Sequence, residues 1–165
     1  MGNLLIIGAG GHGKVIRELA ESTGVYDAID FIDDNSETAI GRVDDLEKFR
    51  SKYQYALVSL GNNELRAKLY KKIIELGYEI PILIHSTAYI SESCQIGRGT
   101  VVEPKAIINS NVWIGEGCII SPGTIIDHDA VLGKYVHANS GSIIMAGSKV
   151  DSFSKIDAGY VYRNK

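Results

Sequence analysis

Aliphatic residues return at every sixth position through the second half of the chain. Twelve of the fourteen positions reached by steps of six are Ile, Val or Leu, and the steps fall on Ile84, Ile90, Ile96, Val102, Ile108, Ile114, Ile120, Ile126, Leu132, Ala138, Ile144, Val150, Ile156 and Tyr162. The position two before each step is small or slender, as at Cys94, Thr100 and Ser148. Because residues i−2 and i of a strand share one face, both are predicted to point inward. A period of six with inward aliphatics is typical of a parallel β-helix built from hexapeptide repeats.

This repeat predicts a triangular prism in which each coil holds three short strands and three turns. Residues eighteen apart are then expected to stack at a spacing of about 4.8 Å. Residues 84–165 would form about four and a half such coils. A single coil cannot bury its own apolar side, so the stack of coils is expected to form the core. The periodicity does not show the hand of the winding.

The first half of the chain has a different pattern, in which short apolar strands alternate with helices. The expected elements are strands at residues 3–7, 28–32 and 55–60, and helices at residues 14–22, 44–52 and from 62 or 63 to about 76. This alternation predicts a parallel sheet. The predicted fold is therefore an α/β, Rossmann-like half domain at residues 1–80, followed by an all-β domain at residues 81–165.

The turn after the first strand is rich in glycine and reads Gly8-Ala9-Gly10-Gly11-His12-Gly13. It fits the G-x-G-x-x-G pattern, in which backbone N–H groups and a helix N-terminus meet a phosphate. Asp33 nearly completes the pattern of a dinucleotide site, but a whole dinucleotide needs two such halves. The sequence therefore favours a nucleotide diphosphate joined to another group over NAD. The alternative is that the glycines only permit a tight turn.

The second and third strands are expected to end at the same edge of the sheet, with Asp33 and Asp34 after one and Gly61 after the other. Ligands of open α/β sheets bind at this carboxyl edge. Carboxylates there can accept hydrogen bonds from a ribose or a base N–H, and a glycine lets a ligand approach the backbone closely. A solvated acidic loop is the alternative for the two aspartates.

His128 follows Ile126 by two residues and is expected in a turn, where its side chain projects from the prism. A neutral imidazole there can take the proton of an attacking amine or hydroxyl. Asp127 and Asp129 flank it, and either could bond the ring and favour its cationic form. Gly147 is eighteen residues after Asp129, so its amide is expected beside this turn, where it could donate to an oxyanion.

One wall of the predicted prism carries apolar residues that point outward. They are spaced eighteen apart, at Ile107, Ile125, Ile143 and Val161. A soluble monomer rarely exposes such a stripe. We therefore expect this wall to be an interface between copies of the chain.

Composition and charge exclude several classes of protein. The chain is 45% hydrophobic with a net charge of −3 and has no basic patch, so we expect no nucleic-acid partner. No apolar run is long enough to span a bilayer or to act as a signal peptide, so a cytoplasmic protein without membrane contact is expected. Cys94 and Cys118 fall on different walls, and we expect core residues rather than a disulfide.

Five motifs in this order resemble the sialic acid O-acetyltransferase type of sugar acyltransferases: GAGGHGKVI, FIDDN, LGNNELR, LIHSTAYIS and IIDHDAVLGKYVHANSG. Within that family, the chain is most similar to the UDP-4-amino-sugar N-acetyltransferases of the bacillosamine pathway. The resemblance covers nearly the whole chain. It implies a left-handed β-helix and a homotrimer that moves acetyl from acetyl-CoA to a UDP-linked amino sugar at sites between subunits, without a metal.

The resemblance also implies roles for single residues. His128 would be the general base, supported by Asp129, with Gly147 offering its amide to the reacting carbonyl. Contacts to acetyl-CoA would come from His137, Gly147, Ala158 and Gly159. The sugar nucleotide would be bound by Gly10, Gly11, His12, Asp33, Asp34 and Gly61.

The repeat departs from the family at its C-terminal end. Members continue for further coils, whereas the pattern here ends at Tyr160-Val161-Tyr162, so the β-helix domain is expected to be shortened and its coenzyme contacts reduced. The preferred function is N-acetyl transfer to a UDP-linked 4-amino sugar. The alternatives are O-acetylation of sialic acid or another sugar, and a UDP-sugar-binding or scaffold protein without acetyl transfer.

Overall fold

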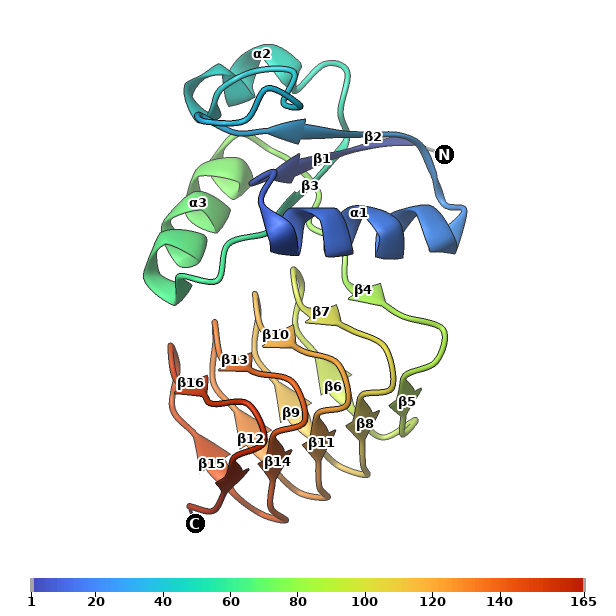
Figure 1. Ribbon diagram of the computed structural model, residues 1–165, viewed down its shortest axis with the longest axis vertical. Coiled ribbons are helices and arrows are strands. Elements are labelled where there is room, and N and C mark those ends of the chain that lie inside the picture. The colour runs from blue at the N-terminus through green and yellow to red at the C-terminus, as the bar shows by residue number, and fades with distance from the viewer. Residues whose placement is uncertain (1, 165) are drawn as a thin grey trace. The chain divides into compact units, whose positions relative to one another are not determined.

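The computed structural model describes residues 2–164 and contains two compact units, which divide between Pro81 and Ile82. The first is an α/β unit and the second a parallel β-helix, as the two patterns in the sequence predict (Figure 1).

The α/β unit is built on a three-stranded parallel sheet with the order β2-β1-β3. Its elements are β1 (Gly2–Ile7), α1 (Gly11–Thr23), β2 (Tyr26–Ile32), η1 (Val43–Asp45), α2 (Leu46–Phe49), β3 (Tyr55–Val58) and α3 (Asn63–Glu75). The four aliphatic residues at 4–7 in β1 are all buried, because β1 is the central strand. Helix α1 packs on β1 and β2, and α3 packs on β3. Among residues 2–164, no helix is both long enough and apolar enough to cross a membrane.

One helix prediction is wrong in its extent. The sequence pattern predicts a single helix over residues 44–52, but the chain makes a 3₁₀ turn at Val43–Asp45, a single α-turn at Leu46–Phe49, and then turns away. The reason lies in Tyr53, which is fully buried and donates its hydroxyl to Oδ2 of Asp30 at 2.6 Å. A helix continued through residue 52 would carry this ring away from the core.

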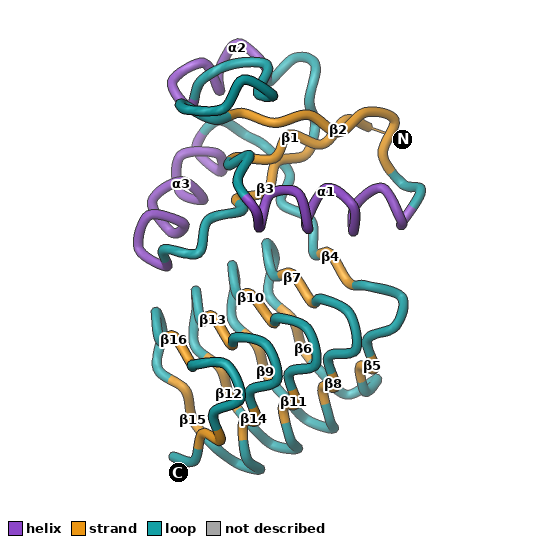
Figure 2. Tube along the Cα trace, in the orientation of Figure 1, coloured by secondary structure: helices purple, strands orange, loops and turns teal. Residues whose placement is uncertain are grey.

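The β-helix consists of two-residue strands joined by four-residue turns (Figure 2). We name its three walls after one strand of each. The β13 wall contains β4 (Leu83–Ile84), β7 (Val101–Val102), β10 (Ile119–Ile120), β13 (His137–Ala138) and β16 (Lys155–Ile156). The β11 wall contains β5 (Tyr89–Ile90), β8 (Ile107–Ile108), β11 (Ile125–Ile126), β14 (Ile143–Ile144) and β17 (Val161–Tyr162). The β12 wall contains β6 (Gln95–Ile96), β9 (Trp113–Ile114), β12 (Val131–Leu132) and β15 (Lys149–Val150).

The predicted stacking is confirmed, because each strand pairs in parallel with the strand eighteen residues away, as Ile126 pairs with Ile108 and Ile144. The inward aliphatics from Val102 to Ile156 are buried, and so are most of the small residues two before them. The inward residues of the first coil are less covered, since Ile84 remains 40% exposed. Cys94 and Cys118 are free thiols in different turns, as expected.

The third residue of most turns has a left-handed backbone, which favours glycine. At the corner between the β13 and β11 walls this position is Lys105, Gly123, Gly141 and Gly159 in successive coils, and φ of Lys105 is 60°. A residue with a Cβ in this conformation costs about 1–2 kcal/mol. Lys105 is therefore the strained member of an otherwise glycine column.

Replacing Lys105 with glycine is expected to stabilise the protein. The change removes the steric cost but adds entropy to the unfolded chain, so we expect a net gain of about 0.5–1 kcal/mol. The backbone bond from Lys105 N–H to Oγ1 of Thr87 (3.2 Å) would remain. Urea unfolding measures the change, with Gly123→Lys as the reverse variant. Equal urea midpoints for the wild type, Lys105→Gly and Gly123→Lys would contradict backbone strain at Lys105.

Candidate active site

The glycine-rich turn joins β1 to α1, and its glycines fall into two groups. Gly8 has φ of 107°, and a Cβ at residue 13 would overlap the carbonyl oxygen of Gly8. These two glycines are required by the tight turn itself. In contrast, a Cβ at Gly10 or Gly11 would meet no atom within 4 Å. The turn therefore leaves open space above Gly10 and Gly11, where a ligand can approach the backbone.

Asp33 and Asp34 follow β2 and have different surroundings. Oδ2 of Asp33 accepts the N–H of Ala9 and its Oδ1 accepts the N–H of Asn35, both at 2.8 Å. Asp33 thus holds the glycine-rich turn against the end of β2. Asp34 is exposed and, within residues 2–164, its side chain accepts one hydrogen bond, from the N–H of Val43 to Oδ1 (3.0 Å). Asp34 is therefore the more available of the two for a ligand.

A cavity of about 240 Å³ lies at this edge of the sheet. It is lined by Ile7, Gly8, Asp33, Asp34, Asn35, Val43, Leu60, Leu65 and Leu69. The lining combines two carboxylates with three leucines, which suits a flat polar ring such as a nucleobase. Gly61 directly follows Leu60 but does not itself line the cavity, and neither do Gly10, Gly11 and His12.

His12 lies in the first turn of α1 and is largely enclosed. Burial, followed by the positive charge of Arg66, lowers the pKa of His12 to about 4. Arg66, on α3, is 1% exposed and donates its Nη1 to the carbonyl oxygen of Leu60 at 2.8 Å. His12 is therefore neutral near pH 7 and would meet a ligand as a neutral group.

His128 lies in the turn between β11 and β12, with its side chain 59% exposed. Its Nδ1 is 2.7 Å from Oδ2 of Asp129. A carboxylate can only accept, so Nδ1 carries the proton and Nε2 of the neutral ring keeps its lone pair. Within residues 2–164, Nε2 has no hydrogen-bond partner. The geometry presents a proton acceptor to the outside.

The structure decides which aspartate bonds the ring. Asp127 instead accepts the backbone N–H of His128 through Oδ1 at 2.8 Å. Asp129 reaches the ring because its backbone is left-handed, with φ of 62°, a conformation that Asp tolerates well among non-glycine residues.

Both aspartates act on the protonation of the histidine. The hydrogen bond to Asp129, and then the negative charge of Asp127, raise the pKa of His128 above its ordinary value of 6.5. The hydrogen bond from His128 in turn lowers the pKa of Asp129. A proton taken up by Nε2 is therefore held next to two ionised carboxylates.

Asp129→Asn is expected to move the acid limb of the pH profile of kcat/KM to lower pH. The limb reports protonation of the free base, and the variant loses the largest influence that raises the pKa of His128. Activity at high pH should also fall, because the imidazolium loses its partner. The variant keeps the left-handed turn, since Asn also tolerates it. An acid limb that stays in place, measured from pH 5 to 9, would contradict the role of Asp129.

Gly147 lies in the same corner, one coil further on. Its N–H donates to the carbonyl oxygen of His128 at 2.9 Å, so this amide is already engaged. The amide of Ala146, eighteen residues after His128, makes no hydrogen bond within residues 2–164. Of the two, Ala146 has the N–H that is available to a developing oxyanion.

The remaining predicted coenzyme residues lie on other parts of the β-helix. His137 points outward from the β13 wall, whereas His128 lies in the corner between the β11 and β12 walls. Nε2 of His137 is 3.3 Å from Oγ of Ser121. Ala158 and Gly159 lie in an exposed turn between β16 and β17. The chain itself does not bring these residues together with His128.

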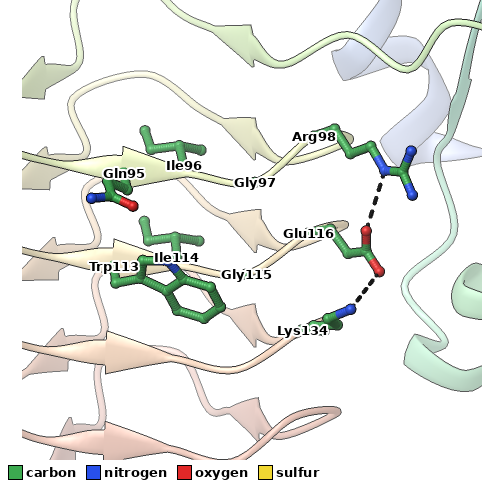
Figure 3. Close-up of a pocket in the computed structure, with 9 residues that line it drawn as sticks. All are labelled: Gln95, Ile96, Gly97, Arg98, Trp113, Ile114, Gly115, Glu116 and Lys134. Atoms are coloured by element: carbon green, nitrogen blue, oxygen red, sulfur yellow. Dashed lines mark hydrogen bonds and ion pairs between the residues drawn. The ribbon is translucent and has the colours of Figure 1, made fainter.

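A second cavity, of about 310 Å³, lies on the β12 wall and was not predicted (Figure 3). The indole of Trp113 lies on one side, and Arg98, Glu116 and Lys134 form an ion-pair ladder on the other. Glu116 Oε2 meets Arg98 at 3.2 Å and Oε1 meets Lys134 at 3.1 Å. Burial opposes ionisation of Glu116, but the bonds from Lys134 and Arg98 outweigh it and its pKa is lowered. Arg98, Glu116 and Lys134 are spaced eighteen residues apart, and this spacing could have predicted the ladder from the sequence.

Two segments of the chain match known families. Residues 3–73 match the PglD N-terminal domain, and residues 93–128 match the bacterial transferase hexapeptide family (six repeats). The second match agrees with the parallel β-helix and assigns it to the left-handed, hexapeptide-repeat type.

One curated relative, an N-acetyltransferase, supports the same assignment. The chain is 33% identical over 112 residues to UDP-N-acetylbacillosamine N-acetyltransferase of Bacillus subtilis, an alignment over 62% of this chain and 51% of the relative. The chain thus spans about half the length of this curated relative.

Solved structures are similar over nearly the whole chain. The acetyltransferase domain of PglB from Neisseria gonorrhoeae FA1090 is 34% identical, with a TM-score of 0.92 over 96% of this chain and 81% of that one. The same domain in complex with acetyl coenzyme A is 31% identical, with a TM-score of 0.86 over 98% of this chain and 91% of that one. A point mutant of GDP-perosamine N-acetyl transferase from Caulobacter crescentus, in complex with CoA and GDP-perosamine, is 26% identical with a TM-score of 0.87 over 99% and 90%.

Proposed function

The chain belongs to the family of hexapeptide-repeat acetyltransferases that carry a PglD N-terminal domain, and from this premise we propose that it transfers acetyl from acetyl-CoA to the amino group of a nucleotide-linked sugar. The preferred acceptor is a UDP-linked 4-amino sugar, by analogy with the Bacillus subtilis relative. The N-terminal unit would bind the nucleotide, and the β-helix would carry the chemistry.

The arrangement of His128 and Asp129 is the observation that carries this proposal. Nδ1 of His128 is bonded to Asp129 at 2.7 Å, while Nε2 is exposed and without a partner in residues 2–164. A base oriented by a carboxylate is what the attack of an amine on a thioester requires, because the amine must lose a proton as the new bond forms. The raised pKa of His128 favours this uptake.

The proposed reaction is a direct transfer. The amine nitrogen attacks the thioester carbonyl carbon, its proton passes to Nε2 of His128, and the carbon–sulfur bond breaks to release CoA as its thiolate. The developing oxyanion needs an N–H donor. We assign this donor to Ala146 in place of Gly147, since the Gly147 amide is bonded to the carbonyl oxygen of His128.

The N-terminal unit suits the nucleotide half of the substrate. The open backbone at Gly10 and Gly11 would meet the diphosphate. The cavity beside Asp34 would take the base, with the exposed carboxylate accepting a base N–H. His12 and Gly61 would lie near the same ligand, and Asp33 would act by holding the turn in place.

We further propose that active sites form between copies of the chain in a homotrimer. His137, Ala158 and Gly159 lie away from His128 in one chain, so a shared coenzyme would have to bridge two copies. The apolar stripe on the β11 wall borders the corner that holds His128, which places the expected interface next to the base.

Release of CoA thiol tests the proposal, with acetyl-CoA and a panel of UDP- and GDP-linked amino sugars as acceptors. We expect turnover with an amino sugar nucleotide and inhibition by free UDP, because the nucleotide half has its own site. Turnover with a free sialic acid that UDP does not inhibit would instead indicate O-acetylation. Calorimetric binding of UDP without binding of acetyl-CoA would indicate a binding or scaffold protein.

A further inference from the structure

The corner that holds His128 is built from polar residues in three successive coils. These are the coils of β5, β8 and β11, which stack on one another in Figure 1. We propose that Asn111 is a positioning residue for the base, whose side-chain amide holds the carboxylate of Asp129 in the orientation that meets the ring of His128. This inference rests on the proposed function, because it concerns the same histidine.

The two oxygens of Asp129 are divided between two partners. Nδ2 of Asn111 donates to Oδ1 at 3.2 Å, and Nδ1 of His128 donates to Oδ2 at 2.7 Å. Asn111 lies in the turn between β8 and β9, eighteen residues before Asp129, so the stacking of coils brings them together. A carboxylate engaged at both oxygens cannot rotate without losing a bond. Asn111 therefore restricts Asp129 to the rotamer that reaches the ring.

Asn111 is itself held in place. Its backbone is left-handed, with φ of 59°, and its N–H donates to Oγ of Ser93 at 2.9 Å. Asn tolerates this conformation better than most residues. A hydrogen-bonded column thus runs from Ser93 through Asn111 and Asp129 to His128, and its last member is the ring.

A second pair in the same corner provides an internal comparison. Nδ2 of Asn109 donates to Oδ1 of Asp127 at 3.0 Å, again across one coil. Asp127 contacts the backbone N–H of His128 and not its ring. The two Asn–Asp pairs have the same chemistry and lie in the same corner, but only the Asn111 pair leads to the imidazole. This difference separates positioning of the ring from simple support of the turn.

Few charged groups face this column. Within the turn, the charges are those of Asp127 and Asp129. The coil on one side presents Asn109, Ser110 and Asn111, and the coil on the other side presents Met145, Ala146 and Gly147, all uncharged. The same corner carries Glu92 two coils before His128 and Arg163 two coils after it. A change in the pKa of His128 on removing the Asn111 amide would therefore report on Asp129.

Asn111→Gly tests the proposal, because glycine removes the amide and accepts the left-handed turn without strain. The pKa of His128 is read from the NMR titration of its ring proton, assigned with His128→Ala. We expect this pKa to fall by about 0.5, as Asp129 leaves the ring for part of the time. We expect kcat to fall about tenfold, less than for loss of the base itself, with KM for acetyl-CoA unchanged. Asn109→Ala should leave the pKa in place.

A double-mutant cycle with Asp129→Asn gives the decisive comparison. If Asn111 acts through Asp129, Asn111→Gly should not change the pKa of His128 further in the Asp129→Asn background. The proposal would be overturned if Asn111→Gly did not lower the pKa of His128 in the wild-type background. It would also be overturned if the pKa fell equally in the wild-type and Asp129→Asn backgrounds. The titration does not depend on turnover. A shifted pKa in a protein that transfers no acetyl group would therefore leave the role of Asn111 in place and reject the proposed function.

Discussion

Replacing His128 with alanine is expected to lower kcat by about 10²–10⁴-fold, the usual contribution of a general base. The variant lacks the imidazole that accepts the proton of the attacking amine, and the carboxylates of Asp127 and Asp129, whose pKa values are lowered, are far weaker bases. The thermal midpoint should hardly change, because the ring is mostly exposed and its one side-chain bond is to an exposed carboxylate. Steady-state thiol release and a thermal melt of the same preparation measure both effects.

His85 offers a matched control for that variant. It also lies in a turn of the β-helix, and its Nδ1 is 2.9 Å from Oγ1 of Thr87. His85→Ala is expected to keep wild-type turnover, because Nδ1 of His85 faces the hydroxyl of Thr87, whereas Nδ1 of His128 is oriented by a carboxylate. Loss of folding in His128→Ala, or equal activity in the two variants, would make His128 a structural residue.

Ile125→Arg is expected to separate the assembled copies and to abolish most activity with them. Ile125 points outward from the middle of the β11 wall, between Ile107 and Ile143. Val161 at one end of the stripe is 50% exposed, and Tyr89, which pairs with Ile107 beyond the other end, is 59% exposed. An arginine at its centre would place a charge in an apolar interface, where burial without a partner is costly.

Light scattering on wild type and Ile125→Arg measures this effect directly. We expect a trimeric mass for the wild type and a monomeric mass for the variant. Ile125→Val is the control, because it keeps the stripe apolar and should keep the assembly. A monomeric wild type, or an Ile125→Arg variant that remains assembled, would contradict an interface on this wall.

The β-helix could be predicted almost completely from the sequence. Its strands are so short that one inward aliphatic defines each of them, and any shift in register would expose the row from Val102 to Ile156. The bounds of the helices in the first unit could be predicted less accurately. At residues 44–52 the local pattern indicated a helix, but burial of Tyr53 and its bond to Asp30 ended it early.

The site could be predicted only in outline. The sequence places Asp127 and Asp129 symmetrically around His128, and the left-handed backbone at residue 129 decides between them. The register of eighteen that relates Asp129 to Gly147 also relates it to Asn111, but a side-chain bond depends on rotamers that spacing does not contain. The Gly147 amide is engaged by a backbone bond to the carbonyl oxygen of His128, which depends on the turn geometry and not on the spacing alone.

Transfer of a labelled acetyl group shows whether His128 promotes acetylation of a sugar amine. The protein is incubated with acetyl-CoA carrying ¹³C in the acetyl group and a UDP-linked 4-amino sugar, and the products are identified by NMR. We expect the label to appear as an amide on the sugar nitrogen, at a rate that His128→Ala reduces by about 10²–10⁴-fold. Label found only in acetate or in an ester, or amide formed equally fast by His128→Ala, would contradict it.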